Sequence, residues 1–165
     1  MAKRDATGPI TLSVLERLID RDPDTRSEIG LSRAQSLREL KLALKRDLEW
    51  LLNTRRTIEP APETARETVR SVYQYGLSDI SSKSVLSSRD HSDLVRDMEA
   101  AITIFEPRLK RARVRMEAGE GDFRTLKFVI EGLLCMDPAP EPVRFDTVLE
   151  LGKGEYEVKG ADLAQ

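Results

Sequence analysis

The stretch that decides the fold is Ile104-Phe105-Glu106-Pro107-Arg108-Leu109, where apolar residues stop recurring at helical spacing and begin to alternate. Proline lacks an amide N–H and pushes the preceding residue out of the α region, so a helix that includes Phe105 has to end at Glu106. In extended chain Glu106 and Arg108 share a side, because side chains two apart lie on one face. On charge pattern alone, the simplest interpretation is a local salt bridge that holds the corner.

Before this corner the sequence predicts three helices. The first can be capped by Ser32 or by Ser36, the second in a capping box with Glu39. Its apolar residues form one stripe that we assign to the core, namely Leu37, Leu40, Leu44, Leu48 and Leu51. A second helix is predicted to start at the spacer Glu59-Pro60-Ala61-Pro62 and to stop at Gly76. Its apolar side carries Ala65, Val69, Val72 and Tyr73. The third carries Leu94, Met98 and Ile102 and ends at the corner.

After the corner, apolar residues recur at every second position instead of at every third or fourth. A half-buried strand runs through Ala112 and Val114, a hairpin loop is expected at 119–122, and two more strands precede a short last one at Tyr156 and Val158. The fold class predicted is α+β, with three helices packed on one face of an antiparallel three- to four-stranded meander and a short N-terminal amphipathic arm. We expect an arm at 1–30, one domain at 31–160 and a disordered tail at 161–165.

The arm has apolar residues at helical spacing, namely Leu12, Leu15 and Leu18. Asp20 to Asp24 ends this segment within about three turns, which is too short for a helix that is stable alone in water. The segment therefore needs a surface to lie on. The residues themselves leave two surfaces open, the chain's own domain and a groove on another protein.

Composition narrows the function classes. Charged residues make up 34% of the 165 residues, but the formal net charge is only -2, which does not indicate bulk attraction to nucleic acid or to an anionic membrane. Cys135 is the one cysteine, so no metal cluster can be built on thiols and we expect a buried structural thiol. No phosphate-binding loop precedes a predicted helix, and we expect no cofactor and no metal site. The N-terminus has no apolar core of an export signal, and no run of 18 apolar residues occurs. We therefore expect a cytoplasmic protein that does not insert into a membrane.

Several arginines are candidates for an interface. Arg55 follows a helix end, where it either complements the helix dipole or faces a partner. Arg111, Arg113 and Arg115 line the outer face of the first strand, where a solvated face with cross-strand ion pairs is the simplest interpretation. A nucleic-acid site is not favoured there, because aromatic residues for base stacking are not interleaved.

Four segments in order resemble one protein family. Phe105-Glu106-Pro107-Arg108-Leu109 is similar to the signature of the wedge proteins of contractile-tail baseplates, which have a member in type VI secretion systems. Three more matching segments are Ser13 to Leu18, Leu51 to Arg55 and Ser71 to Leu77, so that the resemblance runs from about Thr11 to Tyr156.

The resemblance implies an assembly role. It implies contacts with the baseplate proteins TssF and TssG, for which the arm is our candidate, and with the sheath proteins TssB and TssC through exchanged strands. It also implies that Glu106, Pro107 and Arg108 form an assembly motif, completed within the chain or across a subunit boundary. The baseplate would be docked at the inner membrane.

Some relatives have carried a lysozyme-like label, so peptidoglycan cleavage is the alternative function. A glycosidase needs two carboxyls, one of them in a desolvated pocket where it keeps its proton. Glu106 is the best placed carboxyl, but the neighbouring Arg108 favours its charged form. We therefore expect no enzymatic activity.

Overall fold

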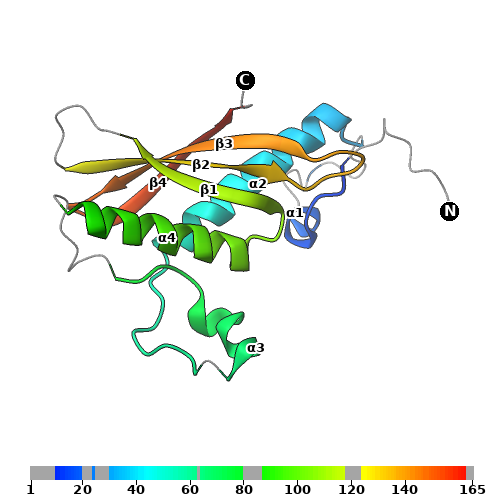
Figure 1. Cartoon of the computed structure of the whole chain (residues 1–165). Coiled ribbons are helices and arrows are strands. Elements are labelled where there is room, and N and C mark those ends of the chain that lie inside the picture. The colour runs from blue at the N-terminus through cyan, green and yellow to red at the C-terminus, as the bar shows by residue number, and fades with distance from the viewer. Residues whose placement is uncertain are drawn as a thin grey trace.

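Two long helices lie against one face of a four-stranded sheet (Figure 1). The structure is a computed structural model that describes residues 10–19, 24, 30–62, 64–79, 87–117 and 124–162. Residues 161 and 162 are described by their backbone alone. The helices are α1 (Val14–Leu18), α2 (Arg33–Asn53), α3 (Arg66–Val69), the 3-10 helix η1 (Val72–Gln74) and α4 (Ser88–Phe105). The strands are β1 (Leu109–Glu117), β2 (Thr125–Leu134), β3 (Glu141–Glu150) and β4 (Glu155–Asp162).

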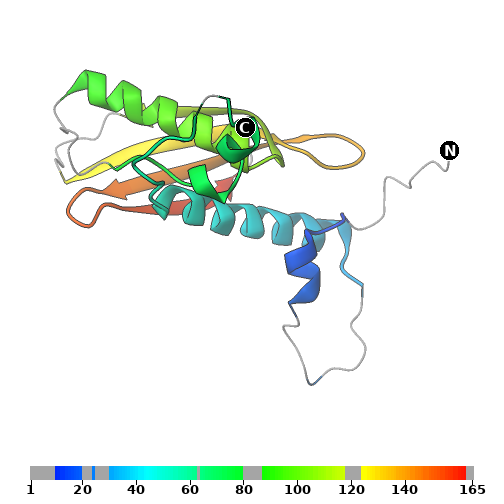
Figure 2. The same ribbon diagram turned by 90° about the horizontal axis from the view of Figure 1, so that it is seen from below.

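The sheet is an antiparallel meander in the order β1-β2-β3-β4, which confirms the mixed α+β class. At its centre Ile130 pairs with Val114 on one side and with Phe145 on the other. All three side chains are buried against the helices. Figure 2 shows α4 running along the β1 side of the sheet and α2 along the β4 side. The core therefore lies between these two helices and one face of the sheet.

Helix α2 begins at Ser32, not at Ser36. The Ser32 side chain accepts from the backbone N–H of Gln35, whose side chain accepts in turn from the Ser32 backbone N–H. Ser36 is buried inside the helix and donates its hydroxyl to the Ser32 carbonyl at 2.8 Å. The predicted capping box between Ser36 and Glu39 is therefore wrong. The apolar stripe is confirmed, with Leu40, Leu44, Leu48 and Leu51 buried and Leu37 packed at the edge of the core.

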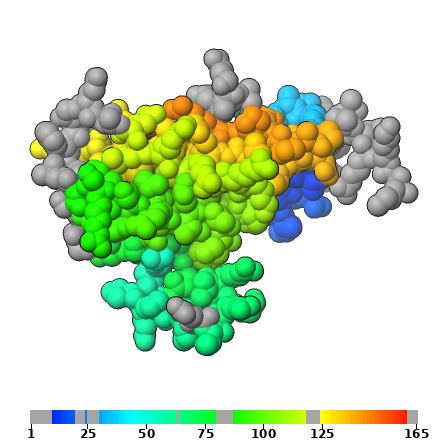
Figure 3. All heavy atoms as spheres, viewed as in Figure 1, coloured from blue at the N-terminus to red at the C-terminus, as the bar shows by residue number. Residues whose placement is uncertain are grey.

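The second predicted helix, between the spacer at 59–62 and Gly76, does not form as one element. The chain makes the single turn of α3, bends at Arg70 and makes the short η1. Val72 is 90% exposed, so the predicted apolar side does not face the core. These elements belong to a side lobe, which we define as residues 54–62 and 64–79 and which projects away from the sheet (Figures 1 and 3).

Two other expectations need correction. Strand β4 continues to Asp162 in pairing with β3, so the chain does not leave the fold at residue 161. Cys135 is exposed just after β2 and is not a buried thiol. The expected hairpin loop at 119–122, the start of the arm at 1–9 and the end of the tail at 163–165 lie outside the described residues.

Candidate functional site

The predicted corner forms where α4 meets β1. Glu106 caps the end of α4 by donating its backbone N–H to the Ile102 carbonyl, and Pro107 prevents another helical turn. The Glu106 carbonyl then accepts from the backbone N–H of Leu109 at 3.1 Å, which closes a tight turn into β1. This turn directs the Glu106 side chain inward, and the residue is only 5% exposed.

Arg108 forms a two-pronged ion pair with Glu106. Its Nε donates to Oε1 at 2.7 Å and its Nη2 to Oε2 at 2.5 Å. The Arg108 backbone N–H adds a third bond to Oε1 at 3.2 Å. These bonds raise the pKa of the Arg108 guanidinium above its ordinary value, against the opposing effect of burial. The corner thus holds a fixed charged pair, which is the arrangement expected from the two-residue spacing.

The pair is part of a longer series that sequence reasoning did not find. Arg108 Nη2 also lies 2.6 Å from Asp47 Oδ2 on α2. Arg46, on the same helix, places its Nη2 2.7 Å from Asp47 Oδ1 and 2.8 Å from Oε1 of Glu16 on α1. We call these five residues the ion-pair ladder: Glu16, Arg46, Asp47, Glu106 and Arg108. It joins the arm, α2 and the corner, and its members are too far apart in sequence for periodicity to connect them.

The arm lies with its charged side inward and its apolar side outward. Glu16 is 8% exposed, and its carboxylate is held toward the protein by the ion pair with Arg46. Val14 and Leu18 are 70% and 77% exposed, and Leu15 is 47% exposed. Leu12 packs at the edge of the core instead. Of the three predicted arm residues, two therefore face solvent and one anchors the arm.

A pocket of about 330 Å³ lies between the arm and the corner. We call it the corner pocket. Its lining comes from the arm, α2, the side lobe and the corner, namely Ser13, Leu15, Asp47, Leu51, Tyr75, Phe105, Glu106, Pro107 and Arg108. The structure thus brings the predicted assembly motif and the arm residue Leu15 into one site.

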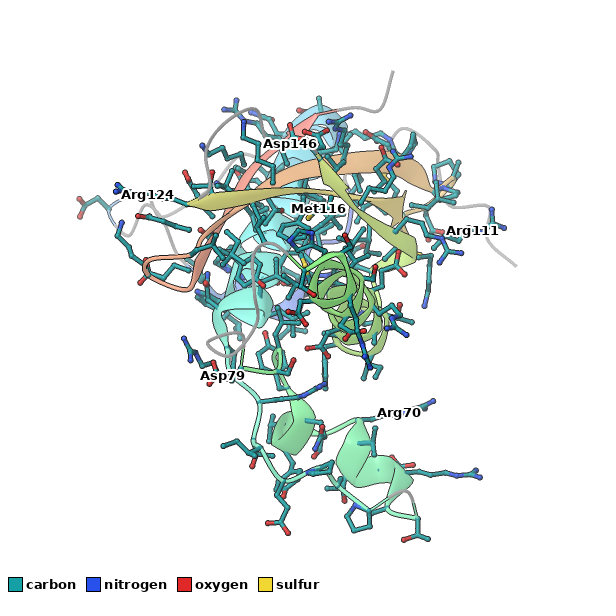
Figure 4. The ribbon with its side chains drawn as sticks, turned by 60° about the vertical axis from the view of Figure 1, so that its left-hand side comes forward. Arg70, Asp79, Arg111, Met116, Arg124 and Asp146 are labelled. Carbon is teal, nitrogen blue, oxygen red and sulfur yellow. The ribbon has the colours of Figure 1, made fainter. Side chains whose placement is uncertain are left out.

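The other candidate arginines lie elsewhere. Arg55 is in the side lobe, where its Nη1 lies 2.7 Å from Asp79 Oδ1. Arg111 is at a bulge of β1 with φ of 54° and extends from the sheet (Figure 4). Arg115 pairs with Glu131 across to β2 at 2.5 Å, and Arg113 lies 3.9 Å from Glu99 of α4. The outer face of the sheet carries charges of both signs, for example the ion pair of Arg144 with Asp146. Figure 4 shows Asp146 on this outer face and Met116 on the face that the helices cover.

Among the described residues, a helix side chain forms hydrogen bonds with the backbone of each edge strand of the sheet. On β1, the backbone N–H of Val114 donates to Glu99 Oε1 at 2.8 Å. On β4, Tyr156 donates its N–H to Asn53 Oδ1 at 2.7 Å and accepts from Asn53 Nδ2 at 2.8 Å. Asn53 therefore makes both hydrogen bonds that a residue of a neighbouring strand would make. Sequence reasoning assigned neither residue a role.

Within the described residues, no set of three or more side chains is arranged to hold a metal ion. No helix that the structure describes combines the length and the apolar character required to cross a bilayer. The corner pocket and the ion-pair ladder are consequently the features around which a function can be argued.

Comparison with known proteins gives one family. The family described as baseplate wedge protein gp25 matches residues 38–139, which include α2, the side lobe, α4, the corner, β1 and β2. The arm and the last two strands lie outside the matched range. No curated protein matches the chain. Since the match covers more than half of the chain, the protein belongs to the gp25 family of baseplate wedge proteins, whose homologue in type VI secretion systems is TssE.

Proposed function

We propose that this protein is a TssE-like structural component of a type VI secretion baseplate. In this role it joins the wedge proteins TssF and TssG to the contractile sheath of TssB and TssC. The protein acts in the cytoplasm, as part of a baseplate docked at the inner membrane. The observation that carries the assembly role is the family match over the corner and the elements around it.

The arm supports a partner contact on physical grounds. Val14, Leu15 and Leu18 face outward on a helix of five residues, while the charged Glu16 faces the protein. Burying an apolar side chain of this kind contributes about 1.5–3 kcal/mol, so the outward side offers a favourable contact that the described fold leaves unused. We assign this side to TssF and TssG.

The corner supports a second contact through its charged residues. Arg108 holds Glu106 and Asp47 in fixed positions, so a change at Arg108 alters the surface between the arm and the start of β1. We assign Glu106, Pro107 and Arg108 to the junction with the sheath. The same geometry does not favour glycoside cleavage, because the Glu106 carboxylate already accepts three hydrogen bonds from Arg108.

Strand addition is the mechanism proposed for templating the first sheath ring. An added strand bonds to the outward backbone groups of an edge strand. Here it would take over the Val114 N–H from Glu99 on β1, or the Tyr156 groups from Asn53 on β4. These two side chains occupy the edges until a partner strand replaces them.

Affinity purification from cells that build the machine tests the proposal. The tagged wild-type chain is compared with Leu15→Asp plus Leu18→Asp, with Arg108→Ala, and with the control Lys153→Ala in the β3–β4 turn. We expect the wild type and the control to recover TssF, TssG and sheath proteins. The arm variant should lose TssF and TssG, and Arg108→Ala should lose the sheath proteins. Recovery of a folded wild-type chain without any of these partners would overturn the assignment.

A further inference from the structure

The corner pocket has features of a binding site for one long side chain. We propose that it binds an arginine side chain presented by a partner protein. The inference deepens the proposed assembly function and rests on it for the source of the partner. It concerns what enters the pocket, whereas the assembly proposal concerns which proteins are joined.

The shape of the lining suits an apolar stem with a planar head. Leu15 and Leu51 supply aliphatic walls from the arm and α2. Tyr75 and Phe105 meet edge to face with ring centroids 5.2 Å apart. A guanidinium binds favourably against aromatic faces, and its methylene stem packs against aliphatic groups. Four different segments of the chain thus contribute to a cavity that an arginine can enter.

The carboxylates that line the pocket favour binding of a cation. The ion-pair ladder has three carboxylates and two guanidiniums, and a carboxylate stands at each end, Glu16 on the arm and Glu106 at the corner. The five residues together therefore carry a net charge of −1. Two of its carboxylates, Asp47 and Glu106, line the pocket itself. One additional guanidinium would balance the series.

Both lining carboxylates can still accept hydrogen bonds. An ionised carboxylate accepts about four. In the described residues, Asp47 Oδ2 accepts from Arg108 alone among side chains, and Glu106 Oε2 also accepts one bond, from Arg108 Nη2. These two oxygens offer acceptor sites to the planar fork of an incoming arginine.

The aromatic part of the lining lies in the same negative field. Burial raises the pKa of the Tyr75 hydroxyl, and the charges of Asp47 and Glu106 raise it further. An acidic or phosphorylated group would meet the same repulsion as the ionised tyrosine. A purely apolar side chain would cover the two carboxylates without offering them a donor, which is unfavourable.

The test uses the full chain and small arginine mimics. The ¹⁵N-labelled protein is titrated with N-acetyl-arginine amide and, separately, with N-acetyl-citrulline amide, which has nearly the same shape but no charge. We expect the arginine compound to shift the amide signals of Leu15, Tyr75, Phe105 and Arg108. The citrulline compound should bind about tenfold more weakly, because charge-assisted hydrogen bonds are about twice as strong as neutral ones.

A variant with nearly unchanged shape tests the role of Asp47. Asp47→Asn should weaken binding of the arginine compound about tenfold, whereas Glu150→Gln, an equal change of net charge at the end of β3, should leave it unchanged. Signals outside the pocket report whether Asp47→Asn remains folded. Equal binding of the two compounds to the wild type, or shifts spread over the outer face of the sheet, would overturn the inference. Either result leaves the purification experiment able to succeed, so the two proposals fail separately.

Discussion

Arg108 contacts residues that are far apart in the sequence. Its guanidinium bonds to Glu106, two residues away, and to Asp47 on another helix. The side chain is 23% exposed and that of Glu106 is 6% exposed, so the pair is largely removed from water. Removing one member of such a pair costs more than the pair contributes, because the other charge remains buried without compensation.

We predict that Arg108→Ala lowers the free energy of unfolding by about 3 kcal/mol. The reason is that Glu106 then stays buried without its counter-ion. Urea unfolding measures the change, and Arg113→Ala is the control, since Arg113 is 77% exposed and 3.9 Å from its acidic neighbour. The control should lose about 0.5 kcal/mol or less. Equal losses in the two variants would contradict the importance of the buried pair.

The buried hydroxyl of Tyr156 makes stability depend on pH in the alkaline range. Burial raises the pKa of its hydroxyl above the ordinary value of 10.0, and the charge of Asp97 adds to the rise. The hydroxyl has no hydrogen-bond partner among the described residues. Above pH 10.0 the unfolded chain releases this proton while the folded chain retains it. The contribution of the Tyr156 hydroxyl to the free energy of unfolding is therefore fully present below pH 10.0 and declines as the pH rises past that value.

We expect Tyr156→Phe to leave stability at neutral pH within about 1 kcal/mol of the wild type. At alkaline pH the variant should lose less stability than the wild type, because it has no proton to release. Urea midpoints at about pH 8 and about pH 11 provide the comparison. A parallel decline in the two proteins would show that other groups control the alkaline loss.

At the scale of elements, the side lobe is held at its base. The backbone N–H of Leu77 donates to the Thr54 carbonyl at 2.8 Å, and that of Arg56 donates to the Leu77 carbonyl at 2.9 Å. Asp97 of α4 joins both ends, because it lies 3.0 Å from Arg56 and accepts from Ser78. The lobe is therefore attached to α4, although its own helices are short.

Gly76 makes this close approach possible. It has φ of +106°, and a Cβ at this position would overlap the Thr54 carbonyl. We predict that Gly76→Ala lowers the free energy of unfolding by about 2 kcal/mol or more, through backbone strain and this overlap. Gly152→Ala is the matched control, because nothing lies within 4 Å of its Cβ position. Thermal unfolding and hydrogen exchange at Leu77 measure both effects. Normal exchange protection in Gly76→Ala would refute the proposed role of the glycine.

At the scale of the whole molecule, the arm is attached through charge and the domain is held by its core. The core cluster consists of residues from α2, the side lobe, α4 and the sheet, with Ile10 and Leu12 only at its edge. Arg46 keeps Asp47 as a partner if Glu16 is removed. Loss of the arm should therefore leave the domain folded.

We predict that deleting residues 1–20 leaves a cooperative thermal transition but weakens capture of TssF and TssG. The deletion removes the outward apolar side of α1 together with Glu16. Circular dichroism measures folding, and co-purification measures capture. A folded deletion variant that captures both partners as well as the wild type would remove the arm from that interface.

Much of the fold could be predicted because its signals are local. The stripe of α2, the end of α4 at Pro107 and the alternation in β1 and β3 follow from spacing within single elements. The side lobe does not form the helix that its sequence predicts. Four apolar residues at helical spacing do not stabilise a helix there, because the bridge between Arg55 and Leu77 at the base of the lobe holds the segment away from the sheet. Strand β4 is longer than the sequence predicts, because β3 supplies hydrogen-bond partners to the backbone of a segment whose residues have little β-propensity of their own.

The sequence by itself determined the corner, the apolar stripe of α2, the alternation in β1 and β3, and the Glu106 and Arg108 pair, since each depends on residues close together in the chain. The tertiary structure alone decided that Asp47, Arg46 and Glu16 extend this pair, that Asn53 and Glu99 occupy the sheet edges, and that Leu15 faces the corner pocket. These contacts join residues up to 103 positions apart. Periodicity reports which face of an element is apolar, but it carries no information about which elements meet, because packing of the whole core sets that choice.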